Sequence, residues 1–308
     1  MIEKLLPAFL FIALLSSPVT AKTLTVCQSG CDFITIQKAI DHTATQTGDI
    51  ISPLDTIHTE PGIVVSKSVI LVGDSQRKSI IQADETAEAA ANRVFLIARG
   101  AMVIFKNLVI RHGNPPEYPN SGGGINNQGH LTIDNCEITQ NIARTSGGGI
   151  WNNGVLLIEN SDISFNRALR RGQPGYACGS GGGIQNEKGS SLVIKNSIVS
   201  NNHSEKAGGG LFISCESAAA IINTKIHHNK SVVSGGGVRA MGNLSISNSQ
   251  ISENSVGGIT ASNRLDMSNT TVSGNTHGAN CHLACNRGVC GKAGELSGNK
   301  IEGGECVR

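Results

Sequence analysis

The sequence Ser146-Gly-Gly-Gly-Ile150 is one of five copies of a short phrase that decides the fold. The first glycines of the copies stand at positions 122, 147, 181, 208 and 235, so the steps are 25, 34, 27 and 27 residues. A repeat of this length is typical of a solenoid, in which each unit packs only against its neighbours. The other four copies are Ser121–Ile125, Ser180–Ile184, Ala207–Leu211 and Ser234–Val238.

Each repeat also holds a short strand pattern that ends at an asparagine. Aliphatic residues alternate in Leu131-Thr-Ile133 and Leu156-Leu-Ile158, which predicts strands with one apolar face. A helical repeat does not fit, because glycine is costly in helices. Two asparagine columns follow the repeat: Asn107, Asn135, Asn160, Asn196, Asn223, Asn248 and Asn269, and then Asn141, Asn166, Asn202, Asn229, Asn254 and Asn275.

These patterns predict an all-β protein, a single-stranded parallel β-helix solenoid of roughly nine coils with an aliphatic interior. Coils stacked about 4.8 Å apart give each backbone group a partner in the coil above or below. We interpret the asparagines as bends that tolerate left-handed backbone angles and as ladders of amide hydrogen bonds. The glycines supply positive φ and close approach between coils.

The N-terminal residues 1–21 have the features of a secretory signal peptide. Lys4 is followed by the apolar run Leu5–Leu15, and Val19-Thr20-Ala21 offers a small-residue cleavage site. The apolar run is too short to span a bilayer, and no other segment is a transmembrane candidate.

The β-helix domain is expected over residues 22–275, with a cap at each end. Residues 35–42 read as a short helix with Thr35 as N-cap, which would cover the open edge of the first coil. The repeat fades after residue 275, and residues 276–308 are expected to form a cysteine-rich C-terminal cap.

The chain has nine cysteines, and export predicts that most form disulfides. We expect a small loop closed by Cys27 and Cys31, and a bridge between Cys178 and Cys215 on adjacent coils. Cys136 replaces the Ser or Thr of other coils and is expected to be a buried free thiol. The tail cysteines fit paired CxxC zinc motifs poorly, so two bridges and no metal are predicted, with three pairings open, among Cys281, Cys285, Cys290 and Cys306.

Two stretches resemble known β-helix proteins. Asn141–Ile150 resembles the repeats of polymorphic outer-membrane proteins, Phe-x-x-Asn followed by Gly-Gly-Ala-Ile, with Ile138 in place of the phenylalanine and Gly149 in place of the alanine. Thr25–Asp41, continued by Gly48–Gly73, is similar to the opening of pectate-lyase-like proteins. The resemblance covers residues 24–275 and implies a secreted or surface-exposed right-handed β-helix. Its members include adhesins and enzymes that act on acidic polysaccharides, and the C-terminal membrane barrel usual in the polymorphic proteins is not expected here.

The candidate ligand-binding residues lie mainly on loops. The longest insertion carries three arginines near a tyrosine, which could hold a carboxylate or sulfate on a sugar, although a solvated loop is the alternative. A second loop offers an arginine and a histidine, and the single tryptophan offers either an exposed ring or a shield over a turn. These residues are Arg167, Arg170, Arg171 and Tyr176, then Arg111 and His112, and Trp151.

No catalytic cluster is evident, and catalytic residues are not assigned. One outward column mixes charges and contains no isolated pair of acids, which does not support a glycosidase-like site. The net charge is +2 and no basic stripe with aromatic residues is present, so nucleic acid is not an expected partner. The column consists of Asp134, Glu159, Lys195, Ser247 and Ser268.

The sequence therefore favours a secreted or cell-surface scaffold, adhesin-like or glycan-binding, that presents a face to carbohydrates or host surfaces without a cofactor. Its location would be extracellular, outer-membrane-associated or periplasmic. The alternative is a polysaccharide lyase, esterase or epimerase acting on an acidic polysaccharide, with calcium if it is a lyase. A structural spacer or assembly subunit is the third reading.

Overall fold

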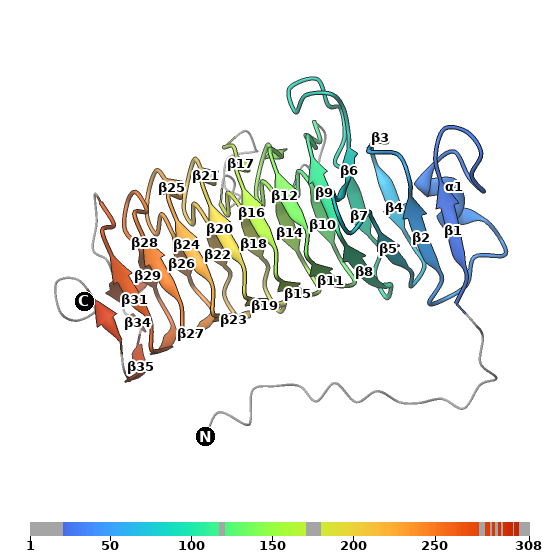
Figure 1. Ribbon diagram of the computed structural model, residues 1–308. Coiled ribbons are helices and arrows are strands. Elements are labelled where there is room, and N and C mark those ends of the chain that lie inside the picture. Colours follow the sequence, from blue (N-terminus) through green and yellow to red (C-terminus); the bar gives the residue numbers. More distant parts are fainter. Residues whose placement is uncertain are drawn as a thin grey trace, which may run out of the picture.

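The computed structural model describes residues 21–116, 121–170, 180–276, 281–283, 285–286, 289–290, 292–297 and 299–301. The chain winds into a long stack of coils, with the helix α1 (Ile36–Asp41) at the N-terminal end (Figure 1). A typical coil contributes one strand to each of three long parallel sheets, here called A, B and C. This arrangement is a parallel β-helix.

Each sheet is built from strands of successive coils. Sheet A contains β1 (Thr23–Val26), β2 (Ile50–Pro53), β5 (Ile70–Val72), β8 (Met102–Lys106), β11 (His130–Asp134), β15 (Val155–Glu159), β19 (Ser191–Lys195), β23 (Ala218–Ile222), β27 (Asn243–Ser247), β30 (Arg264–Ser268) and β35 (Lys292–Ser297). Sheet B contains β3 (Ile57–Thr59), β6 (Ser79–Gln82), β9 (Leu108–Arg111), β12 (Glu137–Thr139), β16 (Asp162–Ser164), β20 (Ile198–Ser200), β24 (Lys225–His227), β28 (Gln250–Ser252), β31 (Thr271–Ser273) and β36 (Lys300–Ile301). Sheet C contains β4 (Ile63–Val65), β7 (Phe95–Ile97), β10 (Ile125–Asn127), β14 (Ile150–Asn152), β18 (Ile184–Asn186), β22 (Leu211–Ile213), β26 (Val238–Ala240), β29 (Ile259–Ala261) and β32 (Cys281–Leu283).

The middle coils carry a fourth short strand between sheets B and C, which the sequence did not reveal. Four such strands form sheet D: β13 (Ile142–Ala143), β17 (Arg167–Ala168), β21 (His203–Ser204) and β25 (Lys230–Ser231). A small antiparallel pair, β33 (Cys285–Asn286) and β34 (Val289–Cys290), lies in the C-terminal region. Sheet A has 11 strands, and β32, β35 and β36 extend the sheets past residue 275, so the stack is longer than the nine coils predicted.

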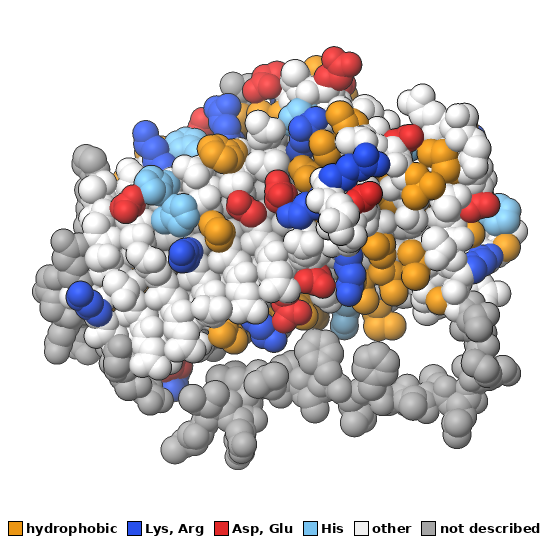
Figure 2. All heavy atoms as spheres, viewed as in Figure 1, with side chains coloured by type: hydrophobic (Ala, Val, Ile, Leu, Met, Phe, Trp, Pro, Cys, Tyr) orange, Lys and Arg blue, Asp and Glu red, His pale blue; other side chains and the backbone are white. Residues whose placement is uncertain are grey.

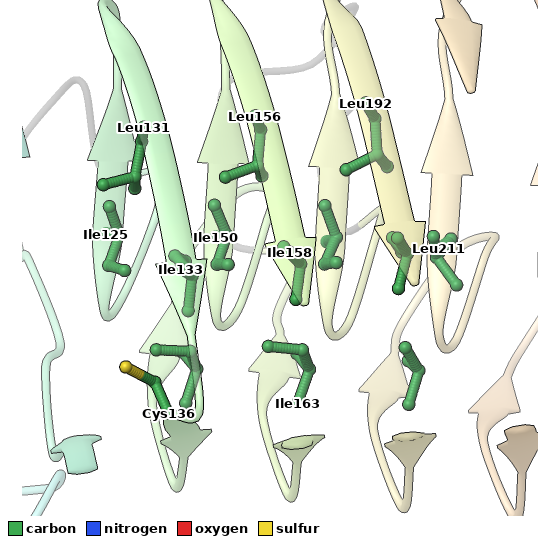
Figure 3. Packing of buried hydrophobic residues seen from close by; sticks show 14 of the residues in the cluster. Ile125, Leu131, Ile133, Cys136, Ile150, Leu156, Ile158, Ile163, Leu192 and Leu211 are labelled. Atoms are coloured by element: carbon green, nitrogen blue, oxygen red, sulfur yellow. The ribbon is translucent and has the colours of Figure 1, made fainter. Parts of the chain in front are cut away.

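The interior is filled by columns of identical or similar aliphatic residues. Leu131, Leu156 and Leu192 occupy matching positions of β11, β15 and β19 and are almost fully buried (Figure 3). Cys136 is buried and free, as predicted, and burial raises the pKa of its thiol to about 12. Its backbone N–H donates to Oγ of Ser161, the equivalent residue of the next coil, at 3.0 Å.

The first asparagine column adopts the predicted left-handed bends, but its ladder forms only in part, since Asn160 donates to Asp134 and not to another asparagine. These residues lie at the corner between sheets A and B with φ near +50°, and Asn135 donates to the Asn107 side-chain oxygen at 2.8 Å. The second column forms a buried ladder in which Asn166 Nδ2 donates to Asn202 Oδ1 at 3.0 Å. The left-handed bend expected at this second column falls instead on the preceding residue, because the asparagine side chain points inward to bond the backbone.

The glycine triplets meet two separate requirements. Gly147 has φ +66°, which side chains rarely adopt. At Gly148 a Cβ would overlap the carbonyl oxygen of Gly182 in the next coil. The triplet therefore allows the chain to turn and lets consecutive coils approach each other, as the sequence predicted.

The N-terminal cap also matches the prediction. The Thr35 hydroxyl accepts from the Lys38 N–H at 3.1 Å and so caps α1. The carboxylate of Glu60 accepts from the Ile36 and Gln37 N–H groups at 2.8 and 2.9 Å, which ties the helix to the next coil. Cys27 and Cys31 form the predicted disulfide beside it.

Candidate functional site

A groove of about 400 Å³ opens on the corner between sheets B and D. It lies between the loop of residues 83–92, which forms most of the connection from β6 to β7, and the outer surface of three successive coils. The groove brings together two residues predicted from the sequence, His112 and Arg167, with residues that were not predicted. Its lining consists of Thr86, Ala87, Glu88, His112, Gln140, Ile142, Phe165 and Arg167.

The floor of the groove is built from the corner residue of each coil. His112, Gln140 and Phe165 directly follow β9, β12 and β16 and have φ of 60°, 55° and 56°. This conformation is rare for a bulky residue and costs roughly 1–3 kcal/mol. Phe165 is nevertheless 57% exposed, so it gains little burial in return. An exposed aromatic ring held in an unfavourable conformation is a candidate for ligand contact.

The wall of the groove is anchored to the coils. Nδ2 of the buried Asn114 donates to the Ala87 carbonyl at 2.9 Å. Ala87 also packs in a small buried apolar cluster with Ile142 and Leu169. These contacts place the exposed Glu88 at the rim, opposite the corner residues.

Two acceptors surround the imidazole of His112. Its Nδ1 lies 3.1 Å from the Asp84 carbonyl oxygen, and its Nε2 lies 3.2 Å from Oε1 of Gln140. Both contacts are hydrogen bonds only if the imidazole carries two protons or the Gln140 amide is turned over. Either way His112 connects the loop to the next coil and its ring is fixed in the groove.

Positive groups continue from the groove along sheet D. Arg167, His203 and Lys230 occupy matching positions of β17, β21 and β25. Within the described residues neither Arg167 nor Lys230 has an ion pair. Burial and these two neighbouring cations lower the pKa of His203, while Glu205 opposes the shift. In Figure 2 basic and histidine side chains lie along the upper edge of the molecule, with some acidic side chains among them. The row formed by Arg167, His203 and Lys230, here called the binding strip, is therefore suited to an anionic ligand.

The other predicted ligand-binding residues do not line the groove. Arg111 lies on β9, where its Nε donates to Gln82 Oε1 at 2.9 Å. Trp151 lies on β14 of sheet C, half-buried, and its Nε1 donates to Glu187 at 2.9 Å. Arg170 is exposed just past β17. Arg171 and Tyr176 lie outside the described residues.

The bridge predicted between Cys178 and Cys215 is not formed at Cys215, which is an exposed free thiol. The register explains the difference. Ile213 pairs with Asn186, so Cys215 comes after the end of β22, whereas Ser180 comes before the start of β18. Cys178 lies outside the described residues. Cys281 is disulfide-bonded.

The mixed-charge column on sheet A resolves into two ion pairs. Lys106 lies 3.6 Å from Asp134, and Lys195 lies 3.3 Å from Glu159. The acids are thus each neutralised by a lysine of a neighbouring coil. Among the described residues, no group of three or more His, Cys, Asp and Glu side chains could hold a metal ion. None of the helices in this part of the chain has the length and apolar character needed to cross a membrane.

The fold is a parallel β-helix with a groove on one of its outer corners. A family model described as a right-handed β-helix region matches residues 65–277. Because the match spans more than half of the chain, the protein belongs to this right-handed β-helix family, which confirms the fold predicted from the sequence.

Solved structures agree on the fold. The chain is similar to pectate lyase Pel9A with a TM-score of 0.60 and 14% identity, over 92% of this chain and 79% of that one. It is similar to pectin methylesterase PemA from Erwinia chrysanthemi with a TM-score of 0.50 and 11% identity, over 90% and 94% of the two chains. No curated protein matches this chain in sequence.

Proposed function

We propose that the protein is a secreted or cell-surface scaffold that binds an acidic carbohydrate chain in the groove formed by the loop 83–92 and the corner of sheets B and D. The observation that carries this proposal is the convergence of Phe165, Arg167 and His112 on one groove. An aromatic ring offers a flat apolar surface to a sugar ring, and an arginine offers paired donors to a carboxylate.

The direction of the ligand follows from the register. Arg167, His203 and Lys230 stand in one row parallel to the helix axis, so a chain with regularly spaced anions would run along the stack. The similarity to a pectate lyase and a pectin methylesterase makes pectin-type polymers the first probes to use. An adhesin-like role, in which this strip attaches the protein to a host or cell surface, is the form of this function that we favour.

The test is isothermal titration of the full chain with an oligogalacturonate and with its methyl-esterified, uncharged counterpart. We expect binding of the acidic chain only. Arg167→Gln should weaken it at least about tenfold, since a charge-assisted hydrogen bond of roughly 1.5–3 kcal/mol is lost. Arg77→Gln is the matched control, because Arg77 is exposed, pairs with Asp74 at 3.6 Å and lies outside the groove lining. Equal affinity of Arg167→Gln and the wild type would refute the assignment of the groove.

A second candidate is catalysis on the same polymer by a lyase, esterase or epimerase. It is favoured by the presence of a carboxylate, Glu88, on the rim of a groove that also holds Arg167 and His112. The measurement is the absorbance of unsaturated products, or release of methanol, from pectin-type polymers with and without calcium. Activity that is abolished in Glu88→Gln while oligosaccharide binding persists would establish the enzyme; binding without turnover would support the scaffold.

A further inference from the structure

Two consecutive histidines meet on the outer surface four coils away from His112. His227 is the last residue of β24, and His228 follows it at the corner position with φ +56°. The bend turns the second imidazole back toward the first, so that their Nδ1 atoms lie 2.8 Å apart. The two rings are almost perpendicular, at 84°, with centroids 5.0 Å apart. Neither residue belongs to the groove lining.

Both rings can be reached from solvent. The side chain of His228 is 53% exposed. His227 is half-buried between Ser200 and Ser252, the residues at matching positions of the adjacent strands. At neutral pH an imidazole is largely uncharged and offers a nitrogen lone pair to a metal.

The outer nitrogen of His228 is held by a carboxylate. Glu253 occupies the corner position of the next coil, and its Oε2 lies 2.7 Å from Nε2 of His228. A carboxylate on the far nitrogen of a metal-binding histidine fixes its ring orientation and tautomer and raises its basicity. The tautomer that donates from Nε2 to Glu253 makes Nδ1 of His228 the acceptor of a hydrogen bond from Nδ1–H of His227, and a metal ion that binds both atoms replaces this proton.

The distance between the two nitrogens is compatible with a shared metal ion. Metal–nitrogen bonds of about 2.0–2.1 Å place two ligands about 2.9 Å apart at a right angle and about 3.3–3.4 Å apart at a tetrahedral angle. The hydrogen bond between the two atoms already holds them 2.8 Å apart, which is close to the separation that square-planar or tetragonal Cu(II) and Ni(II) require. No third protein ligand converges among the described residues, so water completes the site. With only two imidazole ligands, the general order of affinities among divalent first-row metals favours Cu(II) over Ni(II) and Zn(II).

We propose that His227 and His228 form a surface Cu(II) site through their Nδ1 atoms, with Glu253 as a positioning residue. The site lies on the same corner as the carbohydrate groove but shares no residue with it, so it stands independently of the proposed function.

The experiment is titration of the untagged full chain with Cu(II), followed by electron paramagnetic resonance and by the visible d–d band, with the exposed Cys215 thiol blocked beforehand. We expect one copper ion per chain with nitrogen splitting from two imidazoles. His227→Ser and His228→Asn should each abolish this signal. Both replacements use residues that the fold already accepts at these positions. Serine occupies the position of His227 on the two adjacent strands, and Asn201 occupies the position of His228 one coil earlier.

Two further variants separate the roles. Glu253→Gln should weaken copper binding about 10–100-fold while the two-nitrogen signal remains, as expected of a positioning residue. His130→Ala, at an exposed histidine on β11 of sheet A, should leave the affinity for copper unchanged. Retention of the two-nitrogen signal in His227→Ser or His228→Asn would overturn the proposal, and so would binding of Zn(II) as tight as that of Cu(II). Unchanged thermal unfolding of both variants would show that the loss of signal is local.

Discussion

The two outer corners of the β-helix have nearly the same backbone and very different side chains. At the corner between sheets A and B, every residue of the column from Asn107 to Asn269 is asparagine, with φ from 47° to 55°. At the corner between sheets B and D, φ is 55° to 60°, yet the residues are His112, Gln140, Phe165, Asn201, His228 and Glu253. Each corner also has a groove, of about 400 Å³ at the B–D corner and about 380 Å³ at the A–B corner. Only the groove at the B–D corner is lined by an aromatic ring and an arginine.

The difference lies in which residue stabilises the corner. At the A–B corner the asparagine both adopts the left-handed conformation and forms hydrogen bonds along the stack. Replacing it with another residue therefore lowers the stability of the protein. At the B–D corner these tasks are divided, because the buried ladder that includes Asn166 supplies the hydrogen bonds. The residue before the ladder is then free to carry a side chain chosen for another purpose. We therefore place function at the B–D corner.

The largest expected effect is the loss of the buried ladder. Asn166 donates to the Ile138 carbonyl and to Asn202, and its Oδ1 accepts from both nitrogens of Asn141. Asn166→Ala would leave several buried groups without partners, at about 1–3 kcal/mol each. We expect a loss in the free energy of unfolding of at least about 3 kcal/mol, measured by urea denaturation.

The matched control is Asn160→Ala in the exposed ladder of the same coil. The Asn160 side chain donates to Asp134 at 2.9 Å and is exposed, so water replaces the lost bond. Its cost is the left-handed conformation of alanine, roughly 1–2 kcal/mol. Equal losses in the two variants would contradict the division of tasks between the corners.

A smaller effect of opposite sign is expected at Phe165. Asparagine occupies the same position one coil later, at Asn201. Replacing Phe165 with asparagine therefore lowers the energetic cost of the left-handed conformation. We expect Phe165→Asn to stabilise the protein by about 1 kcal/mol in thermal unfolding. The same variant should bind acidic oligosaccharide more weakly, since the ring surface in the groove is removed.

The reverse replacement sharpens this test. Asn201→Phe places a second ring in the same backbone conformation and should destabilise the protein by a similar amount. If Phe165→Asn loses stability instead, then the ring contributes packing that its 57% exposure does not suggest, and the corner is structural.

Much of the fold could be predicted from sequence, because the features that define it repeat. Glycine triplets, the aliphatic alternation and both asparagine columns each follow from a local preference that returns once per coil. The groove could not be predicted in the same way. The wall residue Glu88 and the floor residue Phe165 belong to coils that only the strand register brings together. Phenylalanine is also an unexpected residue for a left-handed position, so the residue type alone does not indicate the bend. The one available signal was its place immediately before Asn166 in the second asparagine column.

The smallest expected effect concerns charge along sheet D. Burial, Lys230 and Arg167 lower the pKa of His203 from its usual 6.5, so the unfolded chain takes up this proton at a higher pH than the folded chain does. Stability contributed at this position is therefore complete above pH 6.5 and is lost as the pH falls toward the folded pKa. His203→Asn should show a smaller drop in Tm between pH 7.5 and pH 5 than the wild type.

The same row of charges predicts what a ligand does to this proton. An anion bound between Arg167 and Lys230 offsets their repulsion of a charged imidazole and raises the pKa of His203. Acidic oligosaccharide should then bind more tightly at pH 5.5 than at pH 7.5 in the wild type, and this difference should shrink in His203→Asn. A pH dependence that is identical in the two proteins would remove His203 from the binding strip, and the contrast between the corners would then rest on the groove alone.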